Sequence, residues 1–315
     1  MSKKTIRAQV EDYLNSLSLT SVDIELIKKK PTRLYHIRSY QGEYILRAGK
    51  LKPFYKKWTG STGFVVQLAA YKAFSRQNLQ HFKVPQLIHH KGWHFMLIEF
   101  LQQAKSYYPD KSTEQNALIR AVAELQILPL KLKIPVHHKF ISGIISWRKN
   151  IRSRAAFNLC RLYTKLGRKN FTKGLQILKK MPRLKKPVWV HRDLNVPNVL
   201  FDQDGPVTLI DFEQLRKQHF GIMTDGVEYS LDPAEVTFDK VFLGRFFQKI
   251  TEYNRDICAD LYADLRGVLL WRMLNISRSS SAKEETRTRA LSFIKDHLLD
   301  DQKYRKWLEE LENSD

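Results

Sequence analysis

A polar run between two short apolar segments constrains this chain more than any other feature of its sequence. Residues 191–198 read His-Arg-Asp-Leu-Asn-Val-Pro-Asn, and a second run, Asp-Phe-Glu at 211–213, follows thirteen residues after Asn198. The apolar segments 188–190 and 207–211 are typical of short buried strands. A loop that leaves one strand and a turn that ends the next would bring these polar side chains into one cleft.

The residue types in this run fit phosphoryl transfer from ATP. That reaction needs a carboxylate near the acceptor hydroxyl, and it needs oxygen ligands that hold magnesium against the phosphates. Asp193 suits the first task, and Asn198 with Asp211 suits the second. Loop-capping carboxylates are the alternative interpretation of Asp193 and Asp211, but capping explains neither Asn198 nor the β-rich segment that precedes the run. We expect His191 to pack and form hydrogen bonds rather than transfer protons, and Arg192 to pair with the acidic segment 225–228.

These residues resemble the protein-kinase-like phosphotransferases, whose signature is H-R-D-L-x-x-x-N followed by an Asp-Phe-Gly metal motif. The first part matches fully, whereas Glu213 replaces the glycine and Asn195 stands where a protein Ser/Thr kinase carries lysine. Both departures resemble the aminoglycoside phosphotransferase and choline kinase group, and the pattern H-x-D-L-N-x-x-N with I-D-F-[D/E] also resembles the bacterial lipopolysaccharide core-sugar kinases. The resemblance implies an α+β, bilobal protein-kinase-like fold and an ATP- and Mg²⁺-dependent kinase in which Glu213 assists at the metal.

Apolar periodicity along the rest of the chain predicts a small β-rich lobe before a larger helical lobe. The predicted elements are helix 5–17, strands 33–40 and 43–47 joined by a Gln-Gly turn, helix 65–74, strands 84–88 and 94–100, helices 114–128, 144–166 and 173–180, and helix from 236 to the end with breaks near Gly267 and at 279–281. We therefore divide the chain into an N-lobe at 1–101, which covers the nucleotide, and a C-lobe at 102–315, which holds the catalytic loop and the acceptor site.

The resemblance also implies which residues hold the nucleotide. Residues 44–47, Tyr-Ile-Leu-Arg, look like the strand that carries the ATP-phosphate lysine, with Arg47 in its place, and a guanidinium can clamp phosphate oxygens bidentately. Gln67 falls where the helical glutamate partner is expected. It could accept a hydrogen bond from Arg47 but not form the ion pair, and its alternative is a plain surface position on the helix. Glu99 and Leu101 resemble the hinge whose backbone pairs with adenine.

The charge of the chain is strongly uneven. There are 54 Lys and Arg against 32 Asp and Glu, a net charge of +22. Residues 1–192 carry 38 basic and 9 acidic side chains, whereas residues 193–315 carry 16 and 23, and no acid lies between Glu124 and Asp193. A solvated surface normally mixes both signs. The basic region 131–186 is therefore expected either to face solvent or to contact an anionic membrane or another polyanion.

The sequence contains no apolar run long enough for a membrane helix, and residues 1–30 lack the apolar core of a secretory signal. We expect a cytoplasmic chain, peripheral at the inner membrane face where the basic region meets anionic lipid.

The expected function is transfer of the γ-phosphoryl group of ATP to a hydroxyl of a small-molecule or glycan acceptor. The basic charge favours an anionic or lipid-linked sugar such as the lipopolysaccharide core, and an antibiotic phosphotransferase of the aminoglycoside type is one alternative. A catalytically weak pseudokinase or nucleotide-binding regulator is another, because Gln67 cannot form the ion pair and the loop at 28–33 has no glycine to cradle phosphates. Nucleic-acid binding is disfavoured, because no helix-turn-helix, zinc-finger or RNP signature accompanies the basic region.

Overall fold

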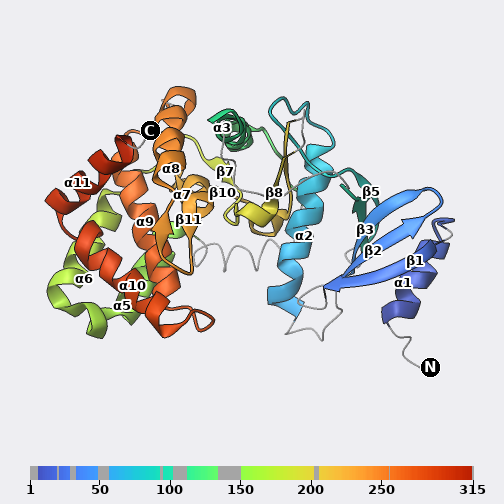
Figure 1. Cartoon of the computed structure of the whole chain (residues 1–315), viewed down its shortest axis with the longest axis horizontal. Helices are drawn as coiled ribbons and strands as arrows, with labels where there is room; N and C mark the ends of the chain where they lie inside the picture. The colour runs from blue at the N-terminus through green and yellow to red at the C-terminus, as the bar shows by residue number, and fades with distance from the viewer. Residues whose placement is uncertain are drawn as a thin grey trace.

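The computed structural model describes residues 6–19, 21–28, 33–48, 57–92, 95–101, 112–133, 150–201, 206–254 and 256–313. An N-terminal sheet lies at one end of the long axis and a group of helices lies at the other (Figure 1). A helix and several short strands lie between these two ends, and they carry most of the polar residues singled out above.

Five antiparallel strands form the N-terminal sheet, in the order β1-β2-β3-β6-β5. The elements of this part of the chain are α1 (Ile6–Asn15), β1 (Ser21–Lys28), β2 (Arg33–Ser39), β3 (Gly42–Ala48), α2 (Lys57–Phe74), β4 (Phe82–Lys83), β5 (Leu87–Lys91) and β6 (Phe95–Glu99). α1 packs Tyr13 and Leu14 against Leu46 of the sheet. The β2–β3 hairpin pairs Ser39 with Gly42, and Gly42 has φ 139°, a conformation that glycine adopts without strain.

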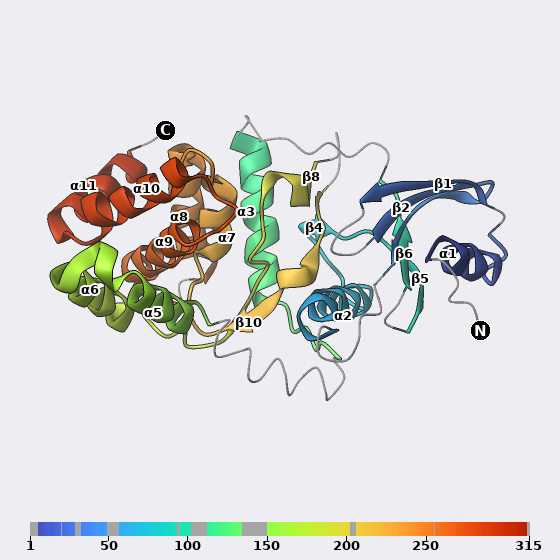
Figure 2. The same cartoon turned by 90° about the horizontal axis from the view of Figure 1, so that it is seen from below.

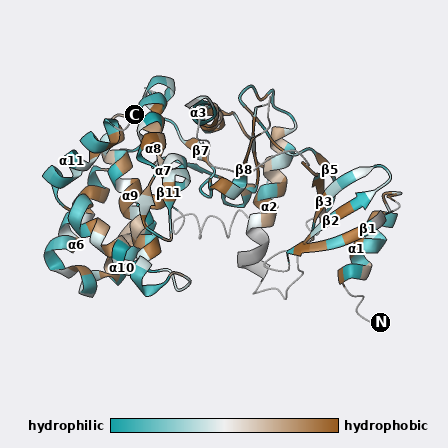
Figure 3. Ribbon diagram, viewed as in Figure 1, coloured by the Kyte–Doolittle hydropathy of each residue, from teal (hydrophilic) through white to brown (hydrophobic). Residues whose placement is uncertain are grey.

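The C-terminal part is mostly helical. Its elements are α3 (Ser112–Ile127), α5 (Ile151–Arg161), α6 (Tyr163–Lys180), β7 (Val188–Val190), η1 (Val196–Asn198), β8 (Val199–Leu200), β9 (Val207–Leu209), η2 (Phe212–Gln214), β10 (Arg216–Gln218), α7 (Thr224–Ser230), β11 (Leu231–Asp232), β12 (Thr237–Phe238), α8 (Lys240–Asn254), α9 (Leu261–Ser277), α10 (Glu284–Phe293), the π-helical turn η3 (Ile294–Leu298) and α11 (Asp301–Glu312). α9 is buried along most of its length, with α5, α6 and α10 packed around it (Figure 2). Hydrophilic residues predominate on α6 and α11 (Figure 3). No helix in the described part of the chain is both long and apolar enough to span a bilayer.

α2 and a three-stranded sheet connect the two ends of the molecule. β4 pairs in parallel with β9, and β9 pairs with β8 in the antiparallel sense. At the end of α2, the ring centroid of Phe74 lies 4.7 Å from that of Phe212. The larger hydrophobic core therefore contains residues from both sides of position 101. The division into lobes at 1–101 and 102–315 remains a proposal.

Two basic residues of α6 lie beside the acidic start of α11. Lys173 and Lys180 line one cavity together with Asp300 and Asp301. Arg266 of α9 adds a hydrogen bond to Asp301 Oδ1 at 2.6 Å. Part of the basic region thus lies against acidic residues from the second half of the chain.

The middle helices differ in extent from the prediction. The sequence predicts one helix over 144–166, but α5 ends at Arg161 and α6 begins at Tyr163, while residues 144–149 lie outside the described residues. Leu162 between the two helices has φ −102° and ψ 9°. Gly167 inside α6 has φ 76°, which interrupts the helical dihedrals. The predicted helix 173–180 is the second half of α6.

Three further predictions are wrong in position. β5 begins at residue 87 rather than 84, because Pro85 has no N–H to donate to a strand ladder. A helix break was predicted near Gly267, but α9 continues through this residue. The glycine makes room for Met181, because a Cβ at position 267 would lie only 2.7 Å from Met181 Sδ. The helix predicted from 236 begins only at Lys240, because β12 precedes it.

The other predicted elements are present. They are the helices at 5–17, 65–74 and 114–128, the strands at 33–40, 43–47, 94–100, 188–190 and 207–211, and the break at 279–281. α2 extends eight residues further toward the N-terminus than predicted, from 65 back to 57.

Gly226 of α7 approaches the ring of Phe246 in α8 so closely that a Cβ would overlap it. We predict that Gly226→Ala lowers the free energy of unfolding by about 2 kcal/mol, because a buried ring must move to relieve the overlap. Gly267→Ala is the matched control, because the flexible Met181 can move aside and the change should stay within about 1 kcal/mol. Urea unfolding measures both variants, and equal effects would contradict the described packing of α7 on α8.

Candidate active site

Pairing between β8 and β9 brings the two polar runs together. The Ile210 N–H donates to the Asn198 carbonyl oxygen at 3.1 Å, and Asp211 follows Ile210 directly. Asp193 lies on the loop between β7 and η1, whose last residue is Asn198. The structure thus places Asp193, Asn198 and Asp211 in one region at the ends of short strands.

The side chain of Asn198 is oriented by the loop itself. Its Nδ2 donates to the Asp193 carbonyl oxygen at 2.7 Å, so its Oδ1 is the atom left for another partner. Asn195 Nδ2 donates to Asp193 Oδ1 at 3.2 Å. The side chain of Asp211 is 35% exposed. Amide and carboxylate oxygens are ligands that Mg²⁺ prefers, so Asn198 and Asp211 fit this ion.

The described residues contain no group of three or more His, Cys, Asp or Glu side chains that could hold a metal. A magnesium ion at Asn198 and Asp211 would therefore take its other ligands from water and nucleotide phosphates, which is the usual coordination of Mg²⁺ in nucleotide sites.

The carboxylate of Asp225 holds the start of the loop. Its Oδ2 accepts a hydrogen bond from the His191 N–H at 2.9 Å, and its Oδ1 accepts one from the Arg192 N–H at 2.8 Å. Burial raises the pKa of Asp225 to about 6, although both backbone donors oppose the shift. Arg192 was expected to pair with the acidic segment 225–228, and it does so through its backbone N–H. The guanidinium of Arg192 lies 5.5 Å from the ring centroid of Trp271.

His191 connects the loop to Asp211. The side chain is fully buried, and its Nε2 lies 2.8 Å from the Ile210 carbonyl oxygen. Burial lowers the pKa of His191 to about 4. The ring is therefore neutral near pH 7, with Nε2 protonated and donating to that carbonyl. The expected packing and hydrogen-bonding role of His191 is confirmed.

Arg192 and Asp211 both adopt a left-handed backbone conformation. Their φ values are 65° and 58°, and they are two of the four non-glycine residues with positive φ among those described. Such conformations cost roughly 1–3 kcal/mol each and persist only where surrounding contacts fix them. The Asp225 carboxylate fixes Arg192, and the His191 ring fixes the residue before Asp211.

Asp193 lies near a buried ion pair. Burial and the charge of Asp211 raise the pKa of Asp193, whereas the charges of Arg272 and Lys28 lower it. Arg272 Nη2 pairs with Glu228 Oε2 at 2.9 Å. Burial raises the pKa of Glu228 to about 7, against the opposing effect of Arg272. The proton affinity of Asp193 is thus set by burial and by the charges of Asp211, Arg272 and Lys28.

Arg47 reaches this region from β3. Its buried guanidinium donates to the Gln67 side-chain oxygen and, at 3.4 Å, to Asp211 Oδ1. It also forms an ion pair with the Glu213 carboxylate. Burial lowers the pKa of Arg47, and the charge of Asp211 offsets part of the shift. Arg47 therefore links α2, β3 and η2.

Gln67 is only 3% exposed, so its alternative interpretation as a plain surface position is wrong. Gly63 lies one helical turn earlier, and a Cβ there would come within 2.8 Å of Glu213 Oε2. The absence of a side chain at Gly63 therefore allows the Glu213 carboxylate to lie against α2.

Glu99 and Leu101, the expected hinge residues, lie at the end of the N-terminal sheet. The Glu99 N–H donates to the Gln86 carbonyl oxygen at 3.0 Å, and Glu99 Oε2 accepts from the Gln86 N–H at 3.1 Å. Leu101 follows and is half-buried. Residues 29–32 of the glycine-free loop lie outside the described residues.

Sequence reasoning missed Arg272 and Asp264 of α9. Asp264 accepts hydrogen bonds from the Gly221 N–H at 2.8 Å and the Met223 N–H at 3.1 Å, and so anchors the segment that leads into α7. Both are ionisable residues within a mostly apolar helical run, a pattern that points to unusual positions but does not identify their partners.

Comparison with known proteins gives a consistent result. The model of the phosphotransferase enzyme family matches residues 33–221, more than half of the chain. Among solved structures, an ADP-bound aminoglycoside phosphotransferase is 13% identical with a TM-score of 0.59, over 91% of this chain and 96% of that one. A choline kinase from Streptococcus pneumoniae is 12% identical with a TM-score of 0.55, over 93% and 99%.

A third structure, an aminoglycoside phosphotransferase in complex with streptomycin and ATP, is 14% identical with a TM-score of 0.58, over 88% of this chain and 93% of that one. No curated protein matches the chain. At these identities the structural likeness concerns the fold, and the expected bilobal protein-kinase-like fold is confirmed.

Glu228→Gln removes a buried carboxyl whose pKa is raised to about 7. A raised carboxyl pKa in the folded state gives stability that is fully present below the unfolded-state pKa, about 4.3. That stability is lost as the pH rises through about 7. We predict that the unfolding free energy of wild type falls more steeply with pH than that of Glu228→Gln. The difference in slope should reach about 1.4 kcal/mol per pH unit between about pH 5 and pH 7. Urea unfolding across this range measures the two slopes, and identical slopes would contradict the raised pKa.

Proposed function

Because the chain belongs to the phosphotransferase enzyme family, we propose that Asp193, Asn198 and Asp211 form the centre of an ATP-dependent kinase site. The observation that carries this assignment is the pair of hydrogen bonds that joins the three residues. Asn198 Nδ2 donates to the Asp193 carbonyl oxygen, and the Ile210 N–H donates to the Asn198 carbonyl oxygen beside Asp211.

Asp193 would orient the acceptor hydroxyl and take its proton. The hydroxyl oxygen then bonds to the γ-phosphorus, the bond from this phosphorus to the bridging oxygen breaks, and ADP leaves. The raised pKa of Asp193 supports this role, because a more basic carboxylate binds the proton more strongly. Asn198 Oδ1 and the Asp211 carboxylate would hold Mg²⁺, which neutralises phosphate charge when bound.

Arg47 would hold the donor phosphates, with Gln67 and Glu213 orienting its guanidinium. The guanidinium has five N–H donors, so phosphate oxygens can replace some of its present contacts. The contact with Gln67 fixes the arginine through an amide oxygen instead of an ion pair. This contact supports an active enzyme over a nucleotide-binding regulator. Glu99 and Leu101 remain the proposed adenine hinge.

The proposed acceptor is an anionic small molecule or sugar. Aminoglycoside phosphotransferases and a choline kinase share the fold, which supports a small-molecule acceptor. The net charge of +22 favours an anion over a polycationic antibiotic. The most specific form of this proposal is that the acceptor is a lipid-linked sugar such as the lipopolysaccharide core. The enzyme would then be cytoplasmic, and its basic region 131–186 would contact the inner membrane face.

Asp193→Ala is expected to lower kcat by about 100-fold or more while nucleotide binding persists, because the proton acceptor is lost. Asp211→Ala is expected to abolish the magnesium dependence of ADP binding as well as turnover. The measurement is acceptor-stimulated ADP release, with neutral, cationic and anionic sugar pools as acceptors. Asp256→Asn is the matched control, because Asp256 is exposed and outside the site. Turnover by Asp193→Ala at the wild-type rate would remove Asp193 from the mechanism.

Arg47→Gln is expected to weaken ADP binding about tenfold or more, because a charged hydrogen-bond donor to phosphate is lost. Calorimetric titration with ADP and Mg²⁺ measures the change. Arg76→Gln, at an exposed position just after α2, is the matched control and should bind ADP as wild type does. Equal affinities in all three proteins would show that Arg47 does not contact the donor phosphates.

A further inference from the structure

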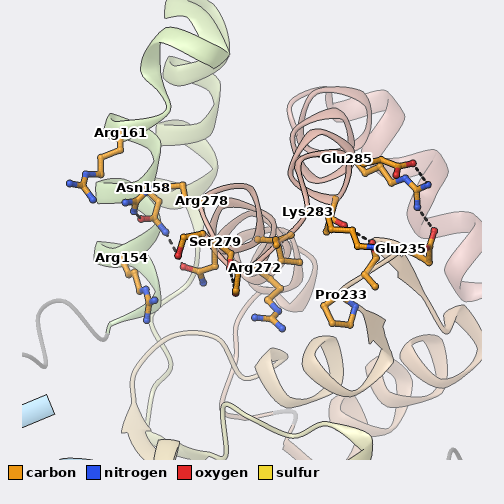
Figure 4. A pocket seen from close by; sticks show the side chains of 18 of the residues that line it. Arg154, Asn158, Arg161, Pro233, Glu235, Arg272, Arg278, Ser279, Lys283 and Glu285 are labelled. Carbon is orange, nitrogen blue, oxygen red and sulfur yellow. Dashed lines mark hydrogen bonds and ion pairs between the residues drawn. The ribbon is translucent and has the colours of Figure 1, made fainter. Parts of the chain in front are cut away.

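A large cavity with strongly basic walls opens between α5, the β11–β12 turn, the end of α9 and α10. Its volume is about 1250 Å³. Six cationic and two carboxylate side chains line it, and Figure 4 shows most of them. The charged lining residues are Arg154, Arg161, Arg272, Arg278, Lys283, Arg289, Glu235 and Glu285.

The two carboxylates of the lining are already engaged. Arg289 pairs with Glu235 and, at 2.6 Å, with Glu285. Arg289 and Glu285 belong to α10, and Figure 4 draws the ion pairs of Glu235 and Glu285 as dashed lines. They contribute little to the excess positive charge.

The excess charge lies on the opposite wall, where α5 faces the end of α9. In the described part of the chain, neither Arg154 nor Arg161 pairs with a carboxylate. Arg278 donates to the neutral Asn158 side chain. Arg272 pairs with Glu228, yet its Nε is buried without a hydrogen-bond partner. This wall therefore carries four arginines, and the only carboxylate paired with them among the described residues is that of Glu228.

These cations also act on one another. Partial removal of the guanidinium from water and the charge of Arg272 lower the pKa of Arg154. Burial and the charges of Arg161 and Arg154 lower the pKa of Arg278. Repulsion of this kind is relieved when an anion binds among the side chains. Two or more uncompensated cations are better matched by a dianionic phosphate than by a single carboxylate, and arginine matches phosphate geometry through paired N–H donors.

The basic wall is electrostatically connected to the proposed catalytic residue. The charge of Arg272 acts on Asp193, and the charge of Arg154 acts on Arg192, the residue before Asp193. Arg272 therefore belongs both to the cavity lining and to the charged surroundings of Asp193, whereas Arg47 is not part of the lining.

We propose that this cavity binds a phosphate group that the acceptor already carries, so that the enzyme phosphorylates a hydroxyl of a phosphorylated sugar or similar small molecule. Arg154, Arg272 and Arg278 would hold this phosphate. The inference rests on the proposed kinase function for its meaning, but the phosphate site itself can be tested without turnover. A polycationic acceptor would add to the repulsion among these arginines.

The test is calorimetric titration, with no nucleotide present, with three probes of similar size: glucose 1-phosphate, glucuronate and glucose. We expect glucose 1-phosphate to bind more tightly than glucuronate, and glucose to show no binding. Arg154→Gln should weaken glucose 1-phosphate binding about tenfold, the effect of losing one charged contact to phosphate. Arg154 is exposed, so this variant should fold, and thermal unfolding checks that it does.

Arg168→Gln is the matched control, because it removes an exposed cation of the same basic region outside the cavity and should leave binding unchanged. Arg47→Gln should also leave glucose 1-phosphate binding unchanged, which excludes binding at the donor side. The reversed charge in Arg154→Glu should weaken binding further than Arg154→Gln.

Three results would overturn the site: no binding of glucose 1-phosphate, binding that is indifferent to Arg154, or glucuronate bound as tightly as glucose 1-phosphate. Failure of the kinase function is a separate outcome, because it appears as absent acceptor-stimulated ADP release in a protein that still binds the phosphate probe through Arg154.

Discussion

The loop at 191–198 depends on one buried carboxylate, that of Asp225. It accepts hydrogen bonds from two consecutive backbone N–H groups, and so holds the left-handed conformation of Arg192, the residue before Asp193. An unpaired carboxylate at such depth would be strongly destabilising. The two backbone donors make its burial tolerable, and Asp264 anchors the chain just before α7 in the same way. Buried acids of the C-terminal helices thus set the backbone of the site.

A chain of packing contacts connects the loop at 191–198 with α2, which lies next to the N-terminal sheet. The His191 ring contacts the carbonyl of Ile210 and the ring of Phe212, and Phe212 packs on the end of α2. On the polar side, Arg47 reaches across from β3 to Asp211. Arg47 and Asp211 are therefore held in one network with α2, so a change in α2 would be felt at Asp211. The lining of the cavity that contains Arg154 and Arg272 includes neither Arg47 nor Asp211, so the proposed phosphate site is separate from this network.

The sequence was most informative where the residues of the site are contiguous or follow a strand. The loop at 191–198 and the turn at 211–213 were recognisable because each joins a short apolar strand to polar residues of defined type. The short hairpin at Gly42 was predictable for the same local reason. Arg272 and Asp264 were not found, because their roles arise only when α9 packs beneath the loop. Gly267 looked like a helix break, whereas a packing contact with Met181 explains it. Tertiary contacts decide these cases, and a single sequence carries no direct record of them.

Two lysines of α6 line one cavity with two aspartates at the start of α11, and these opposite charges are far apart in the order of synthesis. The ribosome synthesises residues 1–192 before residues 193–315. The first part carries 38 basic and 9 acidic side chains, an excess of 29 positive charges. The aspartates that meet Lys173 and Lys180 are added more than a hundred residues later. Residues 193–315 add 23 acidic and 16 basic side chains, so the positive excess falls as this half is synthesised. The acidic residues of the second half therefore act as intramolecular counter-charges, which reduces the attraction of residues 1–315 for polyanions.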